Sequence, residues 1–429
     1  MRVLLLNTSF PPMARSAAHL FYDLGRYLVT RGHQVSVVTE LPWRRLSYDD
    51  SADKYRGARF WLQETMGGME VLRVRGFPFK EGSLTGRGIN TLLLPLSFCF
   101  GCFSMGRADV ALVYSPPLTL GLAAFLLKRL HRSPFVFNVQ DIYPQTLIDM
   151  GLMRNPLLIR FFEWIERFSY GQASRVVVHS DGNRKYLIAR RSVEPEKVVV
   201  IQNWVDTDFI SPLDRLNSFR QCHELGDRFL VCYAGTMGHA QDLSPIIKAA
   251  KDLQKYENIL FLLIGEGVRA NEWRRRVEEW ELHNVRFLPL QPKSVYPSIV
   301  GAADVGLVPL IQELHTPVVP GKLIDFMAGS RPVIATVNLE GDTTKIIHEA
   351  NCGYVFTPDD DQGVARAILE LYCDRSKAQQ FGSNGRTYAE KHFSLKSCAA
   401  QYEELFRQIT KNKTNNREEA QSPKDLEGT

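Results

Sequence analysis

A lysine and an aspartate stand three residues apart where a loop gives way to an amphipathic stretch, in the segment VVPGKLIDFMAG (residues 318–329). Lys322 falls in the first turn of the predicted helix, where the helix dipole disfavours a cation unless an anion binds there. Asp325 lies one turn further along, close enough to hydrogen-bond a ribose while Lys322 contacts phosphate. The two residues therefore indicate a site for a nucleoside diphosphate. The alternative is a solvated i,i+3 ion pair worth about 0.2–0.5 kcal/mol.

Glycine-containing loops follow three predicted strands in the same half of the chain. A glycine after a strand lets the backbone approach a phosphate closely, and the next helix begins with free N–H donors. One such loop is a weak signal, but three at the strand ends of one sheet would open on the same edge. The residues are Gly235, Thr236 and Gly238 in the first loop, Gly265, Glu266 and Gly267 in the second, and Gly321 beside Lys322 in the third.

The elements that position these loops follow from an alternation of short β-branched runs and helix-length amphipathic stretches. VLLLNTSF, QVSVVTE, DVALVYS and FVFNVQD are examples in the first half, and FLVCYAGT, ILFLLIGEG, VGLVPL and RPVIAT in the second. Strands separated by helices predict βαβ units and parallel sheets buried on both faces. The predicted fold class is α/β, with two Rossmann-like, doubly wound parallel-sheet domains that face a central cleft.

The 429 residues are enough for two domains, and the polar stretch NWVDTDFISP (residues 203–212) is typical of a linker between them. We therefore expect one domain over residues 1–205 and a second over residues 206–392. A C-terminal helix over 393–410 could return to the first domain. The tail over 411–429 lacks an apolar stripe and is predicted to be disordered.

Charge and one apolar segment suggest a surface that the chain could contact. Residues 1–200 hold 26 Lys and Arg against 16 Asp and Glu, whereas the remainder holds 26 against 31. A basic first half suits an anionic partner such as a lipid headgroup or a diphosphate. The uncharged run INTLLLPLSFCFGCFSM (residues 89–105) is interrupted by proline and glycine and is too short to span a bilayer. It is either a core helix or an interfacial helix that dips into one leaflet.

The cysteines indicate the redox compartment of the protein, and its motifs indicate which classes of partner it binds. The C-x-x-C pair formed by Cys99 and Cys102 has no second pair of ligands, so free buried thiols in a reducing cytoplasm are favoured over a zinc or redox site. No helix-turn-helix, zinc-finger or RNA-binding pattern occurs, so no nucleic-acid partner is expected. We expect a cytoplasmic protein, peripheral on the inner face of the cell membrane.

The chain resembles the GT-B glycosyltransferases of family 4, and within them a bacterial polysaccharide branch whose type member transfers N-acetyl-L-fucosamine. The resemblance runs from residue 1 to about residue 407, and the ordered combination of motifs is specific. The motifs are SFPP (9–12), RGHQVSVVT (31–39), YSPP (114–117), VQDIYPQ (139–145), NWVD (203–206), YAGTMGHAQDL (233–243), GEG (265–267), NVRFLPLQP (284–292), ADVGLVPL (303–310) and VPGKLIDFMAGSRPVIA (319–335).

The resemblance implies a retaining, metal-independent transfer of a sugar from a UDP- or GDP-sugar to a hydroxyl. Lys322, within the Gly321–Leu323 turn, would take the diphosphate together with the amides of Gly235–Gly238, and Asp325 would take the ribose hydroxyls. The Gly265–Gly267 loop and the strand end at Leu288 would hold ribose and base. No metal ligand and no cofactor besides the nucleotide sugar are expected.

Several positions depart from the family pattern. After the first strand of the second domain, His239 is the only residue that could carry a positive charge where many members have arginine and lysine, and Pro317 replaces a glutamate. In the first domain, MARSAA (residues 13–18) replaces a glycine pair, so Arg15 and Ser16 are acceptor-side candidates. Asp141 follows a strand and is the candidate to orient or deprotonate the acceptor hydroxyl; capping or a local hydrogen bond is its alternative role.

Three functional hypotheses follow from the residues and the resemblance. The first is a retaining glycosyltransferase that extends a lipid-linked saccharide at the membrane, in surface polysaccharide biosynthesis such as that of O-antigen, capsule or exopolysaccharide. The second is a non-catalytic scaffold subunit that binds a nucleotide sugar, which the altered glycine and cation positions suggest. The third is a sugar-nucleotide epimerase, which can use the same two-domain fold.

Overall fold

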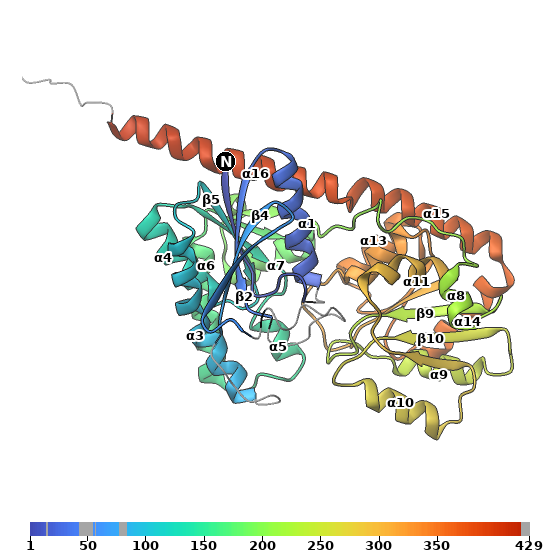
Figure 1. The fold of residues 1–429 in the computed structure, drawn as a ribbon. Coiled ribbons are helices and arrows are strands. Elements are labelled where there is room, and N and C mark those ends of the chain that lie inside the picture. Colours follow the sequence, from blue (N-terminus) through green and yellow to red (C-terminus); the bar gives the residue numbers. More distant parts are fainter. Residues whose placement is uncertain (14–15, 43–54, 56, 77–83, 422–429) are drawn as a thin grey trace, which may run out of the picture.

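The protein folds into two α/β domains, with two long C-terminal helices running along both of them (Figure 1). The structure is a computed structural model that describes residues 1–13, 16–42, 55, 57–76 and 84–421. The described part of each domain contains one twisted sheet with helices on both faces. The predicted α/β class with two parallel-sheet domains is confirmed.

The first domain is built on a sheet of eight strands, as far as the structure describes it, in the order β3-β4-β2-β1-β5-β6-β7-β8. All neighbours pair in parallel except β3 and β4, which form an antiparallel hairpin at one edge. The strands are β1 Arg2–Leu6, β2 Gln34–Glu40, β3 Trp61–Met66, β4 Met69–Val74, β5 Val110–Ser115, β6 Phe135–Val139, β7 Arg175–Val178 and β8 Val198–Val200.

The helices of this domain divide between the two faces of the sheet. The bounds are α1 Ser16–Thr30, α3 Leu84–Ser104, α4 Leu120–His131, α5 Gln145–Asp149, α6 Pro156–Gln172 and α7 Asp181–Arg191, with a 3₁₀ turn at Pro195–Lys197. α3, α4 and α6 share one apolar core with the sheet, and α1 belongs to the core of the opposite face. The strands are buried on both sides, which explains their continuous apolar sequences.

The second domain is a six-stranded parallel sheet within the described residues, in the order β11-β10-β9-β12-β13-β14. The strands are β9 Phe229–Ala234, β10 Ile259–Ile264, β11 Val285–Leu288, β12 Val305–Pro309, β13 Val333–Thr336 and β14 Gly353–Phe356. The chain builds β9 to β11 in one direction and then returns to add β12 beside β9. The helices that follow these two strands pack on opposite faces of the sheet, and such a switch point is where open α/β sheets bind ligands.

The helices of the second domain cover both faces of its sheet. They are α8 Ser218–Cys222, α9 Ser244–Asp252, α10 Ala270–Glu279, α11 Tyr296–Ala302, α12 Gly321–Ala328, α13 Asp342–Ala350, α14 Asp361–Cys373 and α15 Arg375–His392, with a 3₁₀ turn at Lys293–Val295. Trp273 of α10 is fully buried and Trp280 is partly buried against the same core. Both tryptophans therefore serve packing.

The last helix, α16 Leu395–Gln421, leaves the second domain and packs on the first. Tyr402 and Phe406 are fully buried in the core that α16 shares with α1 and the first sheet, and Glu403 accepts a hydrogen bond from His33 (3.0 Å). The helix continues to Gln421, so the expectation of a disordered tail from residue 411 is wrong over 411–421. Extending a helix that tertiary contacts already anchor avoids the cost of nucleation, even where no apolar stripe continues. Residues 422–429 lie outside the described part of the chain.

Helix α3 contains the apolar segment over 89–105. Its buried side includes Leu94, Phe98 and Cys102, so the segment is a core helix, yet its opposite side is also apolar and faces solvent. Within the described residues, no helix combines the length and the apolar character needed to cross a membrane. Cys99 and Cys102 are free thiols.

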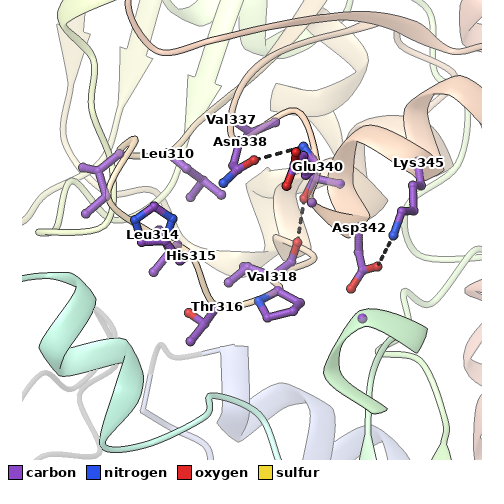
Figure 2. Close-up of a pocket in the computed structure, with 15 residues that line it drawn as sticks. Leu310, Leu314, His315, Thr316, Val318, Val337, Asn338, Glu340, Asp342 and Lys345 are labelled. Carbon is purple, nitrogen blue, oxygen red and sulfur yellow. Dashed lines mark hydrogen bonds and ion pairs between the residues drawn. The ribbon is translucent and has the colours of Figure 1, made fainter. Parts of the chain in front are cut away.

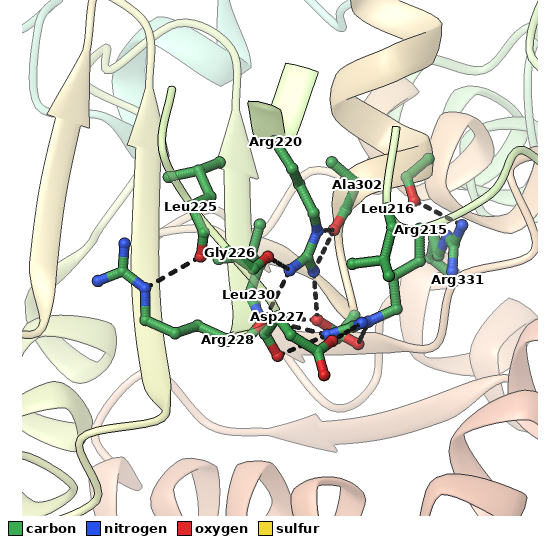
Figure 3. A network of polar contacts seen from close by, with 12 residues as sticks. Arg215, Leu216, Arg220, Leu225, Gly226, Asp227, Arg228, Leu230, Ala302 and Arg331 are labelled. Atoms are coloured by element: carbon green, nitrogen blue, oxygen red, sulfur yellow. Dashed lines mark hydrogen bonds and ion pairs between the residues drawn. The ribbon is translucent and has the colours of Figure 1, made fainter. Parts of the chain in front are cut away.

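A buried ionic network fixes the base of the second sheet (Figure 3). The carboxylate of Asp304, just before β12, accepts hydrogen bonds from Arg220 (2.7 Å), Arg215 (2.8 Å), Arg375 (2.8 Å) and the amide of Leu230 (2.8 Å). Arg220 also donates to the carbonyl oxygen of Ala302 (2.7 Å). The side chains of Arg220 and Asp304 are 2% and 6% exposed. The network joins the linker side of the domain to β9 and β12, the two strands at the switch point.

Replacing Asp304 with alanine is expected to lower the free energy of unfolding by about 3–5 kcal/mol, because it leaves the buried guanidinium group of Arg220 without its counter-charge. Chemical denaturation followed by tryptophan fluorescence measures the change. The matched control is Glu279→Ala, which removes an exposed i,i+4 partner of Arg275 and should cost about 0–1 kcal/mol. Equal effects of the two substitutions would contradict a structural role of the network.

Candidate functional site

Lys322 lies at the switch point of the second sheet, in the first turn of α12. Its side chain runs across the loop after β9: a Cβ atom on Gly235 would lie 3.5 Å from Cε of Lys322. The ammonium group lies 5.1 Å from the ring centroid of Tyr233, which is fully buried. The Tyr233 hydroxyl donates to the carbonyl oxygen of Thr236 (2.5 Å), so ring and loop are held together. The loops that carry Gly235 and Lys322 thus meet as the sequence predicts.

The charge of Lys322 is not neutralised within the described part of the chain. No ion pair joins it to Asp325, so the surface ion-pair alternative does not describe this helix. Burial lowers the pKa of Lys322 to about 8, an effect that the nearby Asp325 opposes. Asp325 instead accepts a hydrogen bond from the Tyr296 hydroxyl (2.9 Å), and burial raises the pKa of Asp325 to about 6. A partly buried cation without a counter-ion marks a place for an anionic ligand.

The glycines of the neighbouring loops allow their backbones to touch. Gly265 has a φ of +143° and Gly267 a φ of +158°, and a Cβ atom on either would lie within 2.2 Å of a carbonyl oxygen in the β9 loop. Hydrogen bonds from Gly235 to Ile264 (2.9 Å) and from Met237 to Glu266 (2.9 Å) complete this contact. The two loops therefore form one rigid rim along the edge of the sheet.

These same contacts correct one expectation from the sequence. The amides of Gly235 and Met237 are used within the rim, and that of Gly238 donates to the side chain of Gln241 (3.0 Å). Of the four amides that the resemblance assigns to the diphosphate, only that of Thr236 makes no hydrogen bond within the described residues. The amides of Gly321 and Lys322 at the start of α12 are also unoccupied there.

The remaining candidates of the second domain differ in how they face solvent. Thr236 and Glu266 are exposed on the rim, and Gly321 has open space around its Cα atom. Leu323 and Leu288 instead pack in the core, so their side chains do not reach a ligand at Lys322. The amide of Leu323 is also occupied, by the carbonyl oxygen of Pro320 (3.0 Å). A one-residue step along the helix from Lys322 turns the side chain from the site into the core.

In the first domain, Asp141 follows β6 and its carboxylate makes no hydrogen bond within the described residues. Burial raises the pKa of Asp141 to about 6. Two contacts of Gln140 fix the turn that carries Asp141. The carbonyl oxygen of Gln140 lies 3.2 Å from Nε2 of His179. The side-chain amide of Gln140 both donates to and accepts from that of Asn203 (3.1 and 2.9 Å). Burial lowers the pKa of His179 to about 4, so the imidazole is neutral and donates the bond to Gln140. Sequence reasoning found Asp141 but not this supporting network.

The acceptor-side candidates are only partly described. Ser16 is the first residue of α1 and is exposed, whereas Arg15 lies outside the described residues. Within the described chain, no group of three or more His, Cys, Asp or Glu side chains is arranged to hold a metal ion.

Side chains of the first domain hold the loop that precedes α12. Asp149 accepts hydrogen bonds from the amides of His315 (3.2 Å) and Thr316 (3.0 Å), and Asn183 donates to the carbonyl oxygen of Pro317 (2.8 Å). No sequence signal pointed to Asp149 or Asn183. The loop before Lys322 is thus fixed by both domains.

A cavity of about 270 Å³ lies beside this loop, at the boundary between the domains (Figure 2). It is lined by the segments after β12 and β13 and, from the first domain, by Gly182 at the start of α7. The Thr343 hydroxyl donates to the carbonyl oxygen of Val318 (2.7 Å), and Lys345 pairs with Asp342 (3.7 Å). The cavity therefore borders the loop that leads to Lys322, and all of its lining except Gly182 comes from the second domain.

Comparisons with known proteins agree with this architecture. Residues 17–204 match the glycosyl transferase 4-like domain, and residues 214–388 match the glycosyl transferases group 1 domain. The chain is 26% identical to the probable glycosyltransferase WbjE of Pseudomonas aeruginosa over 68% of this chain and 73% of that protein. It is also 23% identical to the putative colanic acid biosynthesis glycosyl transferase WcaI of Escherichia coli strain K12. That match spans 78% of this chain and 83% of WcaI.

Among solved structures, Anabaena HepE in complex with UDP-glucose superposes with a TM-score of 0.70 at 16% identity, over 95% of this chain and all of that one. The two matching domains, the two facing sheets and the shared fold define the class: the protein is a glycosyltransferase of the GT-B fold. Its two halves belong to the glycosyl transferase 4-like and the glycosyl transferases group 1 families.

The lowered pKa of Lys322 predicts how binding of a nucleoside diphosphate depends on pH. The ammonium form is present below pH 8 and is lost as the pH rises through about 8, so the affinity for UDP should fall between pH 7 and pH 9. Lys322→Arg keeps its charge at every accessible pH and should not show the fall. Isothermal titration with UDP at several pH values measures both proteins. A parallel pH dependence in the two would show that Lys322 is not the group responsible.

Proposed function

We propose that this glycosyltransferase moves a sugar from a nucleoside diphosphate donor to a hydroxyl of a lipid-linked saccharide, with retention of configuration, in the biosynthesis of a surface polysaccharide. The observation that carries the proposal is the partly buried, unneutralised ammonium group of Lys322 at the start of α12. A diphosphate supplies the anion that this position lacks. The bound UDP-glucose of HepE and the colanic acid role of WcaI support the donor class and the pathway class.

In the proposed reaction, negative charge grows on the diphosphate as the bond to the sugar breaks. The ammonium group of Lys322 and the unoccupied backbone N–H groups of Gly321 and Lys322 stabilise the negative charge of this leaving group. Such fixed groups lower the energy of a transition state strongly. We propose that no divalent ion takes part, so this stabilisation comes from the protein. Asp325, oriented by Tyr296, accepts hydrogen bonds from the ribose hydroxyls.

Asp141 is proposed to face the acceptor hydroxyl from the first domain. With a pKa of about 6 it is mostly ionised at pH 7, so its carboxylate can accept the hydroxyl hydrogen bond and orient the nucleophile. In a front-face reaction the departing phosphate takes the proton, so Asp141 need not be a strong base. The place at the cytoplasmic face of the membrane is proposed from the basic first half of the chain and the apolar segment over residues 89–105.

A non-catalytic scaffold that binds a nucleotide sugar is the second candidate. It is favoured by the β9 loop, where the amides of Gly235, Met237 and Gly238 are occupied and no arginine or lysine adds charge. An assay with nucleotide sugar and membrane extract distinguishes the two functions. Transfer or donor hydrolysis supports the enzyme, and binding without turnover supports the scaffold.

Lys322→Ala is expected to reduce transfer by about 10²-fold or more, because it removes a charge that acts on the leaving group. The control Lys248→Ala removes a lysine that pairs with Asp361 on the surface and should leave transfer unchanged. Radiolabelled donor and membrane extract provide the assay, and circular dichroism shows that both variants remain folded. Undiminished transfer by Lys322→Ala would exclude the proposed site.

UDP, GDP and their sugars are expected to differ in the thermal stabilisation that they give, since only the correct base fits the rim. A ligand at 100 times its dissociation constant stabilises by about 2.7 kcal/mol. The melting temperature is measured with each nucleotide in the presence and absence of EDTA. Stabilisation and transfer that both require a divalent ion would contradict the proposed metal independence.

A further inference from the structure

Helix α3 exposes an apolar stripe to solvent. The side chains of this stripe recur every three or four residues, so they lie on one side of the helix. They are 43–63% exposed and comprise Ile89, Leu92, Leu96, Phe100 and Phe103. The opposite side of α3 is buried in the core through Leu94 and Phe98. A helix that is apolar on both sides is normally covered on both sides.

The stripe continues onto the two neighbouring helices. Phe103 of α3 contacts the ring of His131 in α4 (5.1 Å between centroids), and Phe125 of α4 contacts Phe168 of α6 (5.1 Å). Trp164 stacks on Phe168 at 5.7 Å and is 54% exposed. Leu126 and Leu130 on α4 and Leu157 and Phe161 on α6 are exposed as well.

We call the exposed side of α3, α4 and α6 the three-helix face. More than half of the exposed large hydrophobic side chains in the described part of the chain lie on it. A contiguous apolar surface of this kind marks an interaction site. In Figure 1 the three helices lie on the side of the first sheet that points away from the second domain, so the face does not belong to the interdomain site.

The charges on the three-helix face are of one sign. Within the described residues of the three helices, the exposed charged side chains are Arg129, Arg160 and Arg167. The acidic residues are withdrawn: Glu163 is half-buried, and Glu166 is buried in an ion pair with Arg191 (2.8 Å). Further exposed arginines flank the helices at positions 107, 132 and 154. The occupant of the face must therefore be apolar and anionic at its rim.

We propose that the three-helix face docks the protein on an anionic lipid bilayer. Leucine, phenylalanine and tryptophan side chains enter the headgroup and acyl boundary, and the arginines contact anionic headgroups. The inference rests on the proposed function, because docking would bring the enzyme to the membrane surface that holds a lipid-linked acceptor. It adds that α3, α4 and α6 make the contact with the membrane. The charge pattern disfavours a second copy of the chain, since two arginine rims would repel each other.

The test is sedimentation of the full-length protein with vesicles of phosphatidylcholine, with and without phosphatidylglycerol. We expect binding that requires phosphatidylglycerol and weakens with salt. Leu96→Glu with Phe100→Glu should reduce vesicle affinity at least about tenfold, because full burial of one such side chain is worth about 1.5–3 kcal/mol. The control Leu216→Glu changes a leucine that is 53% exposed outside the face and should bind like wild type. Arg160→Glu should weaken binding only to vesicles that contain phosphatidylglycerol.

Binding of UDP, followed by thermal shift, separates this inference from the proposed function. The double variant Leu96→Glu with Phe100→Glu and the variant Arg160→Glu should both keep wild-type stabilisation by UDP. Wild-type protein that binds UDP but not vesicles, or a double variant that binds vesicles like wild type, would overturn the docking surface and leave the transferase intact. Analytical ultracentrifugation covers the alternative occupant: a wild-type dimer that the double substitution turns into a monomer would also overturn it.

Discussion

The candidate site depends on the ammonium group of Lys322, which the fold holds at a position that disfavours a positive charge. Lys322 is partly buried, it lies at the positive end of a helix, and no acidic side chain within the described residues pairs with it. Burial lowers the pKa of Lys322 to about 8, although the nearby Asp325 opposes the change. The helix dipole also disfavours a cation at this position. A bound diphosphate relieves both effects at once. In the proposed function, the folded protein therefore holds the charge for the diphosphate in place before the ligand binds.

This arrangement is possible because of the order of the strands. β12 returns beside β9, so the loop that carries Lys322 and the loop that carries Gly235 leave the sheet side by side. Gly235 has a φ of +149°, which residues with a side chain rarely adopt, and Tyr233 supplies an aromatic face under the ammonium group. The network around Asp304 fixes the opposite ends of the same two strands. Stability and site geometry thus share one structural origin.

Sequence patterns predicted what depends on local periodicity and on strand ends. The apolar runs gave the two parallel sheets, and the glycines after β9 and β10 marked the rim. The patterns could not show which acceptor each amide would meet, so the occupied amides of Gly235 and Gly238 were not foreseen. They placed Leu323 at the site because it adjoins Lys322, although helical rotation turns it into the core. Contacts between residues far apart in the chain, such as that of Asp149 with Thr316, left no local signal.

Asp149 contacts the same loop in which Pro317 replaces the glutamate of many family members. Proline removes both the expected carboxylate and an amide donor at this position of the loop. The carboxylate that now meets the loop comes from the first domain, where Asp149 accepts hydrogen bonds from the amides of His315 and Thr316. Because these bonds join residues of the two domains, the conformation of the loop before Lys322 depends on the contact between the domains.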